Sequence, residues 1–160
     1  MIKLGIIGLG HMGGYHASVS GNLPTVQLVG IADPSEKNRE KIKAATVIKS
    51  ESYTDWIDAV DAVIIAVPTG MHHTIAADCI KRGKHVLLEK PLTNNLPDAQ
   101  DLVALAQQHG TSLHVGHIER FNGAIQELKK IIHEPLLIEC HRMGPFVARD
   151  RKSTRLNSSH

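Results

Sequence analysis

Three glycines and one acidic residue near the start of the chain have the spacing of a nucleotide-binding turn. Gly8, Gly10 and Gly13 follow an apolar run that ends at Ile7, and Asp33 ends the next apolar run. In a G-x-G-x-x-G turn the first glycine permits the bend, the second lets the backbone approach a pyrophosphate, and the third lets helix pack on strand. An acid about 20 residues further on accepts hydrogen bonds from a ribose. The sequence therefore predicts a dinucleotide site, and NAD is favoured over NADP because a carboxylate repels a 2′-phosphate.

Residues on either side of this pattern complete the prediction. His11 and Met12 stand at the expected start of a helix, whose N-terminus would face the anion, so both are predicted to border the cofactor. Lys37 and Arg39 follow Asp33; they are read as solvated helix charges or as cations that soften the preference for NAD. A glycine-rich turn without a ligand is the other interpretation of the motif, and the strand and helix around it argue against that interpretation.

A lysine beside a glutamate and before a proline closes a later apolar run. Glu89, Lys90 and Pro91 follow the run that ends at Leu88. If the run is a strand of a parallel sheet, Lys90 lies at the carboxyl end of the sheet, where ligands bind. The alternative is a surface lysine with a glutamate neighbour.

Three segments resemble the signatures of the Gfo/Idh/MocA oxidoreductases, the glucose-fructose oxidoreductase and inositol dehydrogenase family. They are Val67–His73, Gly83–Leu92 and Val115–Asn122, in the order and spacing of the family, and the resemblance covers residues 1 to 149. It implies hydride transfer between NAD and a secondary alcohol of a sugar, nucleotide sugar or cyclitol. The resemblance also implies further cofactor contacts, at Pro68, Thr69, His72, Glu89, Lys90, His117 and Arg120. For Lys90 it implies a catalytic role, since its charge would favour a developing alkoxide on the substrate.

Two narrower expectations rest on the same resemblance. Glu119–Asn122 together with Arg142–Phe146 looks most similar to members that act at the 3-position of UDP-N-acetylglucosamine-type sugars. The family's acid–base histidine lies beyond residue 149, so this chain is expected to bind cofactor without turning over a sugar. The alternative function is a non-catalytic, dinucleotide-sensing regulatory protein on the same fold, although a pure sensor has no need of Lys90.

Short apolar runs alternate with helical patterns, and this alternation predicts an α/β fold with a doubly wound parallel sheet, the Rossmann type. Expected strands are Lys3–Ile7, Gln27–Ala32, Ala62–Val67, His85–Leu88 and Ser112–Val115, with a shorter one near Thr46–Ile48. Expected helices start near Met12, Ser35, Tyr53, Met71 and Leu96.

The pattern divides the chain into three parts. Residues 1–118 are predicted to form the dinucleotide-binding domain, and residues 119–149 only the first elements of a truncated C-terminal α+β substrate domain. These elements are a helix with an apolar stripe from Ala124 to Ile132 and a strand at Leu136–His141. The last eleven residues, 150–160, match one translated reading frame of a common sequencing adapter at every position, so we expect them to be an artefact.

Composition excludes several classes of function. The chain has 18 Lys and Arg against 16 Asp and Glu; residues 150–160 hold three bases and one acid, so the rest is balanced at 15 against 15. This balance gives no argument for a nucleic-acid or membrane partner. No apolar run reaches the ~18–20 residues of a membrane span. Two cysteines without metal or redox spacing fit a reducing cytosol. We therefore expect a cytoplasmic protein with no metal, a small-molecule substrate and a homo-oligomeric parent.

Overall fold

The computed structural model describes residues 1–134, 136, 137, 139 and 141. The chain divides into two compact units: the first spans Met1–Ile118, and the second begins at Glu119. Each unit is described by itself below.

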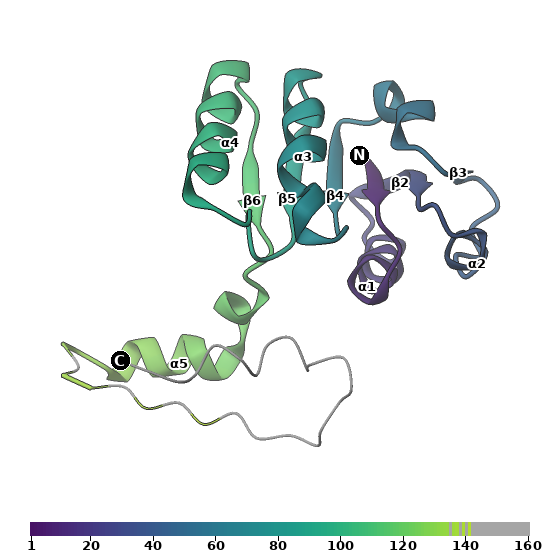
Figure 1. Cartoon of the computed structure of the whole chain (residues 1–160). Coiled ribbons are helices and arrows are strands. Elements are labelled where there is room, and N and C mark those ends of the chain that lie inside the picture. Colours follow the sequence, from purple (N-terminus) through teal and green to yellow (C-terminus); the bar gives the residue numbers. More distant parts are fainter. Residues whose placement is uncertain (135, 138, 140, 142–160) are drawn as a thin grey trace. The chain divides into compact units, whose positions relative to one another are not determined.

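The first unit is a six-stranded sheet in which every pair of neighbouring strands is parallel. The strand order is β3-β2-β1-β4-β5-β6, the order of a Rossmann sheet. The strands are β1 (Ile2–Ile7), β2 (Val26–Ala32), β3 (Ile48–Ser50), β4 (Ala62–Ile65), β5 (His85–Leu88) and β6 (Leu113–Val115). The helices between them are α1 (His11–Ser20), α2 (Glu36–Arg39), α3 (His72–Lys81) and α4 (Leu96–His109). This architecture confirms the predicted doubly wound sheet (Figure 1).

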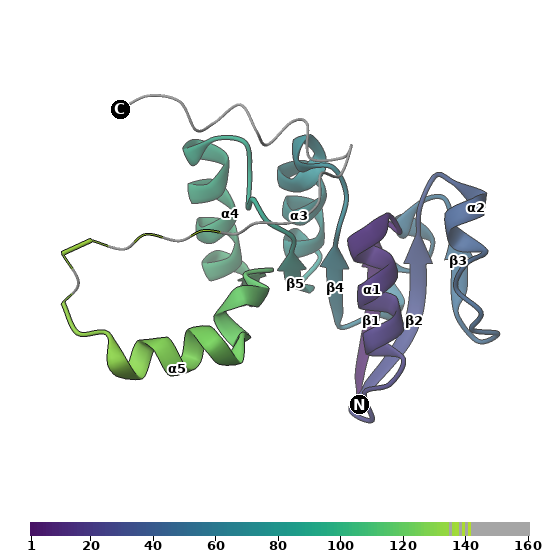
Figure 2. The same cartoon turned by 90° about the horizontal axis from the view of Figure 1, so that it is seen from below.

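Side chains along each strand point to one or the other face of the sheet, and each face carries its own apolar cluster. Leu4 and Ile6 of β1 belong to the cluster that contains Ala17 of α1, whereas Ile7 belongs to the cluster that contains residues of α3 and α4. Figure 2 shows α1 on one side of the sheet and α3 with α4 on the other. Because both faces are covered, the strands are mostly apolar, as parallel strands usually are, with polar residues such as Lys3 and Gln27 near the strand starts.

Trp56 is the largest buried side chain of the first unit, and it packs on two glycines of the sheet. Gly5 of β1 and Gly30 of β2 are register partners, and a Cβ atom at either position would collide with the Trp56 ring. The indole nitrogen donates a hydrogen bond to Oγ of Ser50, 3.0 Å away. The two missing side chains therefore make the space that the ring fills.

Four of the predicted elements differ from the structure by two residues or more, and one of them, the strand predicted at Ala62–Val67, already ends at Ile65. The segment at Tyr53 forms two short 3₁₀ turns, Tyr53–Asp55 and Ile57–Ala59, and not an α-helix, because the chain must place Trp56 between them against the sheet. The helix expected at Ser35 is only the single turn α2. The third strand lies at Ile48–Ser50, two residues later than expected.

The second unit contains one helix among its described residues, α5 (Gly123–Ile131), capped by the Asn122 side chain. It follows a 3₁₀ turn at Ile118–Phe121 and matches the predicted apolar stripe, whose side chains Ile125, Leu128 and Ile131 are exposed. The strand predicted at Leu136–His141 includes residues outside the described ones. Within the described part of the chain, no helix has the length and apolar character that crossing a membrane requires.

Candidate functional site

The predicted site residues of the first unit gather at one edge of the sheet. Ala32, Ile7, Ile65, Leu88 and Val115 form one row of register partners across five parallel strands. Each is the last residue of its strand, so the segments that follow all leave the sheet at its carboxyl edge. These segments carry the site residues Gly8, Gly10, Asp33, Pro68, Thr69, Glu89, Lys90 and His117.

Glycine is favoured at the three positions of the turn for three different physical reasons. Gly8 has a φ of +87°, in the left-handed region that favours glycine. At Gly10 an added Cβ atom would meet nothing within 4 Å, so the backbone stays open to a ligand. At Gly13 a Cβ atom would collide with the Gly8 carbonyl oxygen. The first residues of α1, His11 and Met12, follow this turn, and their side chains are exposed and half-buried respectively.

Asp33 fixes the turn from the neighbouring strand end. Its carboxylate is almost buried and accepts hydrogen bonds from the backbone N–H of Leu9, at 2.7 Å, and of Ser35, at 2.8 Å. The side-chain amide of Asn38 lies 3.2 Å from the same carboxylate. The negative charge that is predicted to receive the ribose thus also connects the glycine turn to the end of β2. The link to Leu9 could not be read from the sequence, since 24 positions separate the two residues.

A hollow of about 540 Å³ adjoins the glycine turn. It is lined by residues of the turn and of α1 and by the segment after α2: Leu9, Gly10, His11, Gly14, Tyr15, Ser18, Asn38, Lys41 and Ile42. Arg39 lies outside this lining, and its guanidinium donates to the carbonyl oxygens of Asp33 and Pro34. These two hydrogen bonds stabilise the turn that follows β2.

The Lys90 turn presents an exposed ammonium beside a buried carboxylate. Among the described residues, the Lys90 side chain has no hydrogen-bond or ion-pair partner, whereas Glu89 is only 6% exposed. One oxygen of Glu89 lies 2.7 Å from Nε2 of His16, and the other accepts the Lys90 backbone N–H at 3.3 Å. The Lys90–Pro91 peptide bond is cis. The available cation of this turn is therefore Lys90, and Glu89 is engaged by the protein.

His72 connects the Lys90 turn to the end of β4. It is only 1% exposed, and its Nε2 lies 2.9 Å from the Val67 carbonyl oxygen. Its Nδ1 faces the carbonyl oxygens of Pro91, at 2.9 Å, and Leu92, at 3.3 Å. Both ring nitrogens thus face backbone carbonyl oxygens, and the ring connects two segments of the edge. Its predicted contact with the cofactor stays a prediction.

The remaining predicted residues differ in where they lie. Pro68 is exposed and Thr69 half-buried in the segment after β4, and His117 is exposed after β6. Arg120 belongs to the second unit, and its role at the cofactor stays a prediction. His16 was not predicted: a histidine three residues after Gly13 on a helix gives no sign that its partner is Glu89.

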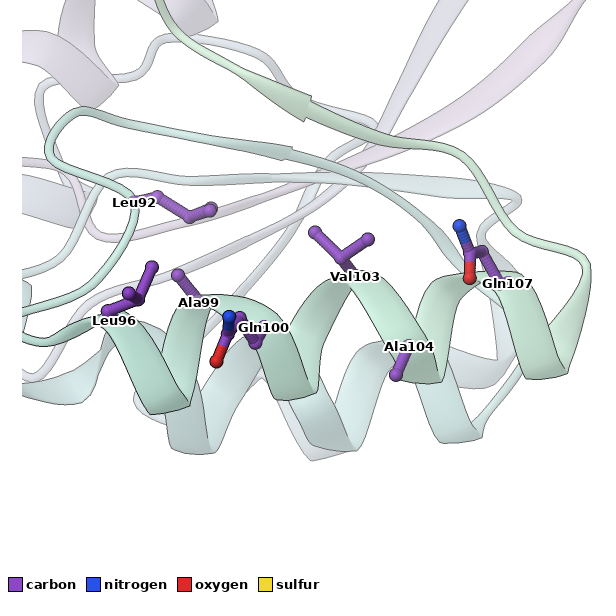
Figure 3. Close-up of a pocket in the computed structure, with 7 residues that line it drawn as sticks. All are labelled: Leu92, Leu96, Ala99, Gln100, Val103, Ala104 and Gln107. Carbon is purple, nitrogen blue, oxygen red and sulfur yellow. The ribbon is translucent and has the colours of Figure 1, made fainter.

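Two other groups of side chains carry no comparable chemistry. Burial raises the pKa of the Cys79 thiol on α3 to about 12, so it is not a nucleophile at neutral pH. A hollow of about 370 Å³ on α4 is lined by Leu92, Leu96, Ala99, Gln100, Val103, Ala104 and Gln107, with no ionisable group among them (Figure 3). Among the described residues no three His, Cys, Asp or Glu side chains gather as a metal site would require.

Known proteins share this fold and this sequence pattern. The family described as an oxidoreductase family with an NAD-binding Rossmann fold, GFO_IDH_MocA, matches residues 2–117. UDP-N-acetylglucosamine 3-dehydrogenase of Acidithiobacillus ferrooxidans is 33% identical over 150 residues, which are 92% of this chain and 47% of the relative. The NADP(+)-dependent scyllo-inositol 2-dehydrogenase IolW of Bacillus subtilis is 32% identical over 136 residues, 83% of this chain and 38% of the relative.

A solved structure agrees with these matches. The crystal structure of scyllo-inositol dehydrogenase from Lactobacillus casei, with bound NAD(H) and scyllo-inositol, superposes with a TM-score of 0.75 at 26% identity, covering 82% of this chain and 40% of that one. The chain thus spans half or less of the length of the curated relatives that it matches. The resemblance inferred from the sequence motifs is confirmed: the chain belongs to the Gfo/Idh/MocA oxidoreductase family, with an NAD-binding Rossmann fold.

Proposed function

We propose that this chain is the cofactor-binding part of an NAD-dependent dehydrogenase that oxidises a secondary alcohol of a sugar, nucleotide sugar or cyclitol. The observation that carries the proposal is that two features leave the same edge of one sheet: an open glycine turn, and the exposed Lys90, whose ammonium has no partner among the described residues. Ligands of open α/β sheets bind at this edge. A dinucleotide with its pyrophosphate at α1 would extend along the edge toward Lys90.

The residues divide the work between the two ends of the cofactor. The backbone at Gly10 and the N-terminus of α1 would hold the pyrophosphate, and Asp33 would face the adenosine ribose. The cofactor, when bound, supplies the hydride acceptor. Lys90 would lie at the nicotinamide end, where its charge lowers the energy of an alkoxide that develops on the substrate.

The choice of NAD over NADP follows from charge. Asp33 is the carboxylate expected to face the adenosine ribose, and it would repel a 2′-phosphate. Arg39 weakens this argument little, because its guanidinium is bonded to the carbonyl oxygens of Asp33 and Pro34. The relatives include NAD and NADP enzymes, so this preference must be measured on this chain.

The substrate class is proposed from the relatives' activities and the motifs. The relative at 33% identity acts on UDP-N-acetylglucosamine, and the motifs at Glu119–Asn122 and Arg142–Phe146 favour the same type of substrate. A non-catalytic dinucleotide sensor is the second candidate, and the exposed Lys90 ammonium at the carboxyl edge of the sheet argues against it.

The test is a titration of the purified chain with NADH and NADPH, followed by NADH fluorescence. We expect weak NADH binding, weaker NADPH binding, and no oxidation of UDP-N-acetylglucosamine or scyllo-inositol, since the residue that removes the hydroxyl proton is expected beyond residue 149. Absence of NADH binding would contradict the proposal. Turnover by this chain would show that the acid–base residue lies within it.

A further inference from the structure

Two side chains from distant parts of the first unit meet behind the Lys90 turn. His16 lies on α1, six residues after Gly10, and Glu89 directly precedes Lys90. Nε2 of His16 and Oε1 of Glu89 are 2.7 Å apart although 73 positions separate the residues. The side chains are 17% and 8% exposed, so water has little access to the pair.

The surroundings of Glu89 explain why it needs this partner. A carboxylate removed from water is costly unless hydrogen bonds compensate for the lost hydration. Oε2 of Glu89 has the Lys90 backbone N–H at 3.3 Å, a long contact, while Oε1 has His16. On another side lies Gly116, where an added Cβ atom would come within 3.1 Å of the carboxylate. Within the described part of the chain, two hydrogen bonds hold this carboxylate, and the His16 contact is the shorter one.

The consequence concerns the position of Lys90. The carboxylate is bonded on one side to α1, the helix that starts at the glycine turn, and on the other to the backbone of Lys90. We propose that His16 is a positioning residue: acting through Glu89, it sets the Lys90 turn relative to the helix that receives the pyrophosphate. This inference rests on the proposed function, in which Lys90 serves the nicotinamide end of the cofactor.

The chain offers a matched control. His73 and Asp101 also form a histidine–carboxylate pair with a 2.7 Å contact, between α3 and α4. This pair is more exposed, at 34% and 53%, and its residues belong to α3 and α4 and not to the glycine turn or the Lys90 turn. A variant of His73 removes the same type of interaction without the proposed positioning role.

The variants exploit side-chain length. Gln places its amide nitrogen as many bonds from the backbone as Nε2 of histidine, so His16→Gln keeps the hydrogen bond, whereas the shorter His16→Asn cannot reach Glu89. Each variant, with His73→Asn as control, is titrated with NADH and with ADP, which lacks the nicotinamide and its ribose. Thermal unfolding followed by circular dichroism verifies that the variants fold.

We expect His16→Asn to weaken NADH binding about tenfold, the worth of roughly one hydrogen bond, with ADP affinity changed less than about twofold. His16→Gln should recover NADH affinity to within about threefold of the unmodified chain, and His73→Asn should change neither ligand. If His16→Asn does not fold, Glu89→Gln, which keeps the size of the side chain, should show the same selective loss for NADH.

Three outcomes would overturn the inference. NADH affinity unaffected by His16→Asn, or NADH and ADP affinities weakened equally, would each leave His16 with a role in the fold alone. Failure of the unmodified chain to bind NADH would overturn the proposed function and this inference together. The unmodified titration therefore separates the two failures.

Discussion

The glycine turn and the Lys90 turn leave the same edge of one sheet, but the protein holds them differently. The glycine turn takes its shape from its own backbone, a left-handed Gly8 and a Gly13 that packs on the Gly8 carbonyl, and Asp33 adds one hydrogen bond to it from the end of β2. The Lys90 turn is held by side chains from other elements, His16 through Glu89 and His72 through two carbonyl oxygens. A turn made by its own backbone is visible in a short motif, whereas a turn held from outside depends on contacts that only the fold creates.

The largest expected effect would separate the two turns by function. In a protein of the relatives' length that carries this sequence, Lys90→Ala should lower kcat by roughly 10²–10⁴-fold, the range of one positioned acid–base or electrostatic group. NADH affinity should change far less, because the glycine turn and Asp33 hold the other end. Steady-state kinetics with a separate NADH titration measure both quantities. A normal kcat in the Lys90 variant would contradict a catalytic role for the Lys90 turn.

The second test acts on the glycine turn. Gly13→Ala places a Cβ atom against the Gly8 carbonyl, so α1 must move; we expect a loss of about 1–3 kcal/mol in the free energy of unfolding, typical of overpacking. NADH and ADP binding should weaken together, in contrast to the His16 variants. Gly14→Ala is the control for stability: its Cβ atom meets nothing within 4 Å, and alanine in a helix should add roughly 0.5–1 kcal/mol. Urea unfolding of both variants gives the comparison, and equal stabilities would refute the packing argument.

A smaller effect concerns the charge beside the glycine turn. Asp33→Asn removes the anion and should narrow the preference for NADH over NADPH by about tenfold, the worth of one close charged contact. Asp61→Asn is a suitable control, because Asp61 accepts the Lys3 backbone N–H at 2.8 Å outside the row of strand ends. The ratio of the NADPH and NADH dissociation constants is the measurement. A chain that prefers NADPH with Asp33 intact would show that this carboxylate does not select the cofactor.

The smallest expected effect lies in a third region, formed by Cys79 of α3 and the neighbouring Tyr53, which belongs to neither turn. Burial raises the pKa of Cys79 from 9.0 to about 12, and burial with the Asp78 hydrogen bond raises that of Tyr53 from 10.0 to about 12. Folding therefore favours the protonated forms, so this stability is present below pH 9 and is lost as the pH rises toward 12. The free energy of unfolding should fall between pH 8 and pH 10, and in Cys79→Ala this fall should be smaller by about 1 kcal/mol. Urea unfolding at the two pH values tests this, and an unchanged pH dependence would count against Cys79.

The same contrast explains how far the sequence could predict the molecule. The doubly wound parallel sheet and the glycine turn follow from local patterns, and the structure agrees with them. The segment at Tyr53 could not be predicted, because its 3₁₀ turns depend on where Trp56 meets Gly5 and Gly30 of other strands. Likewise, nothing near His16 or His72 in the sequence indicates that their partners are Glu89 and the Pro91 carbonyl.

The position of Trp56 has a spectroscopic consequence. It is the only tryptophan of the chain, and its ring is sealed against the sheet of the first unit. Its emission should therefore be blue-shifted in the native state and should move to longer wavelength when this sheet opens, while events confined to α5 stay silent. Reduced nicotinamide absorbs light in the range where a buried indole emits. A single native chromophore could thus report both the opening of the sheet and, by energy transfer, the arrival of the cofactor at its edge.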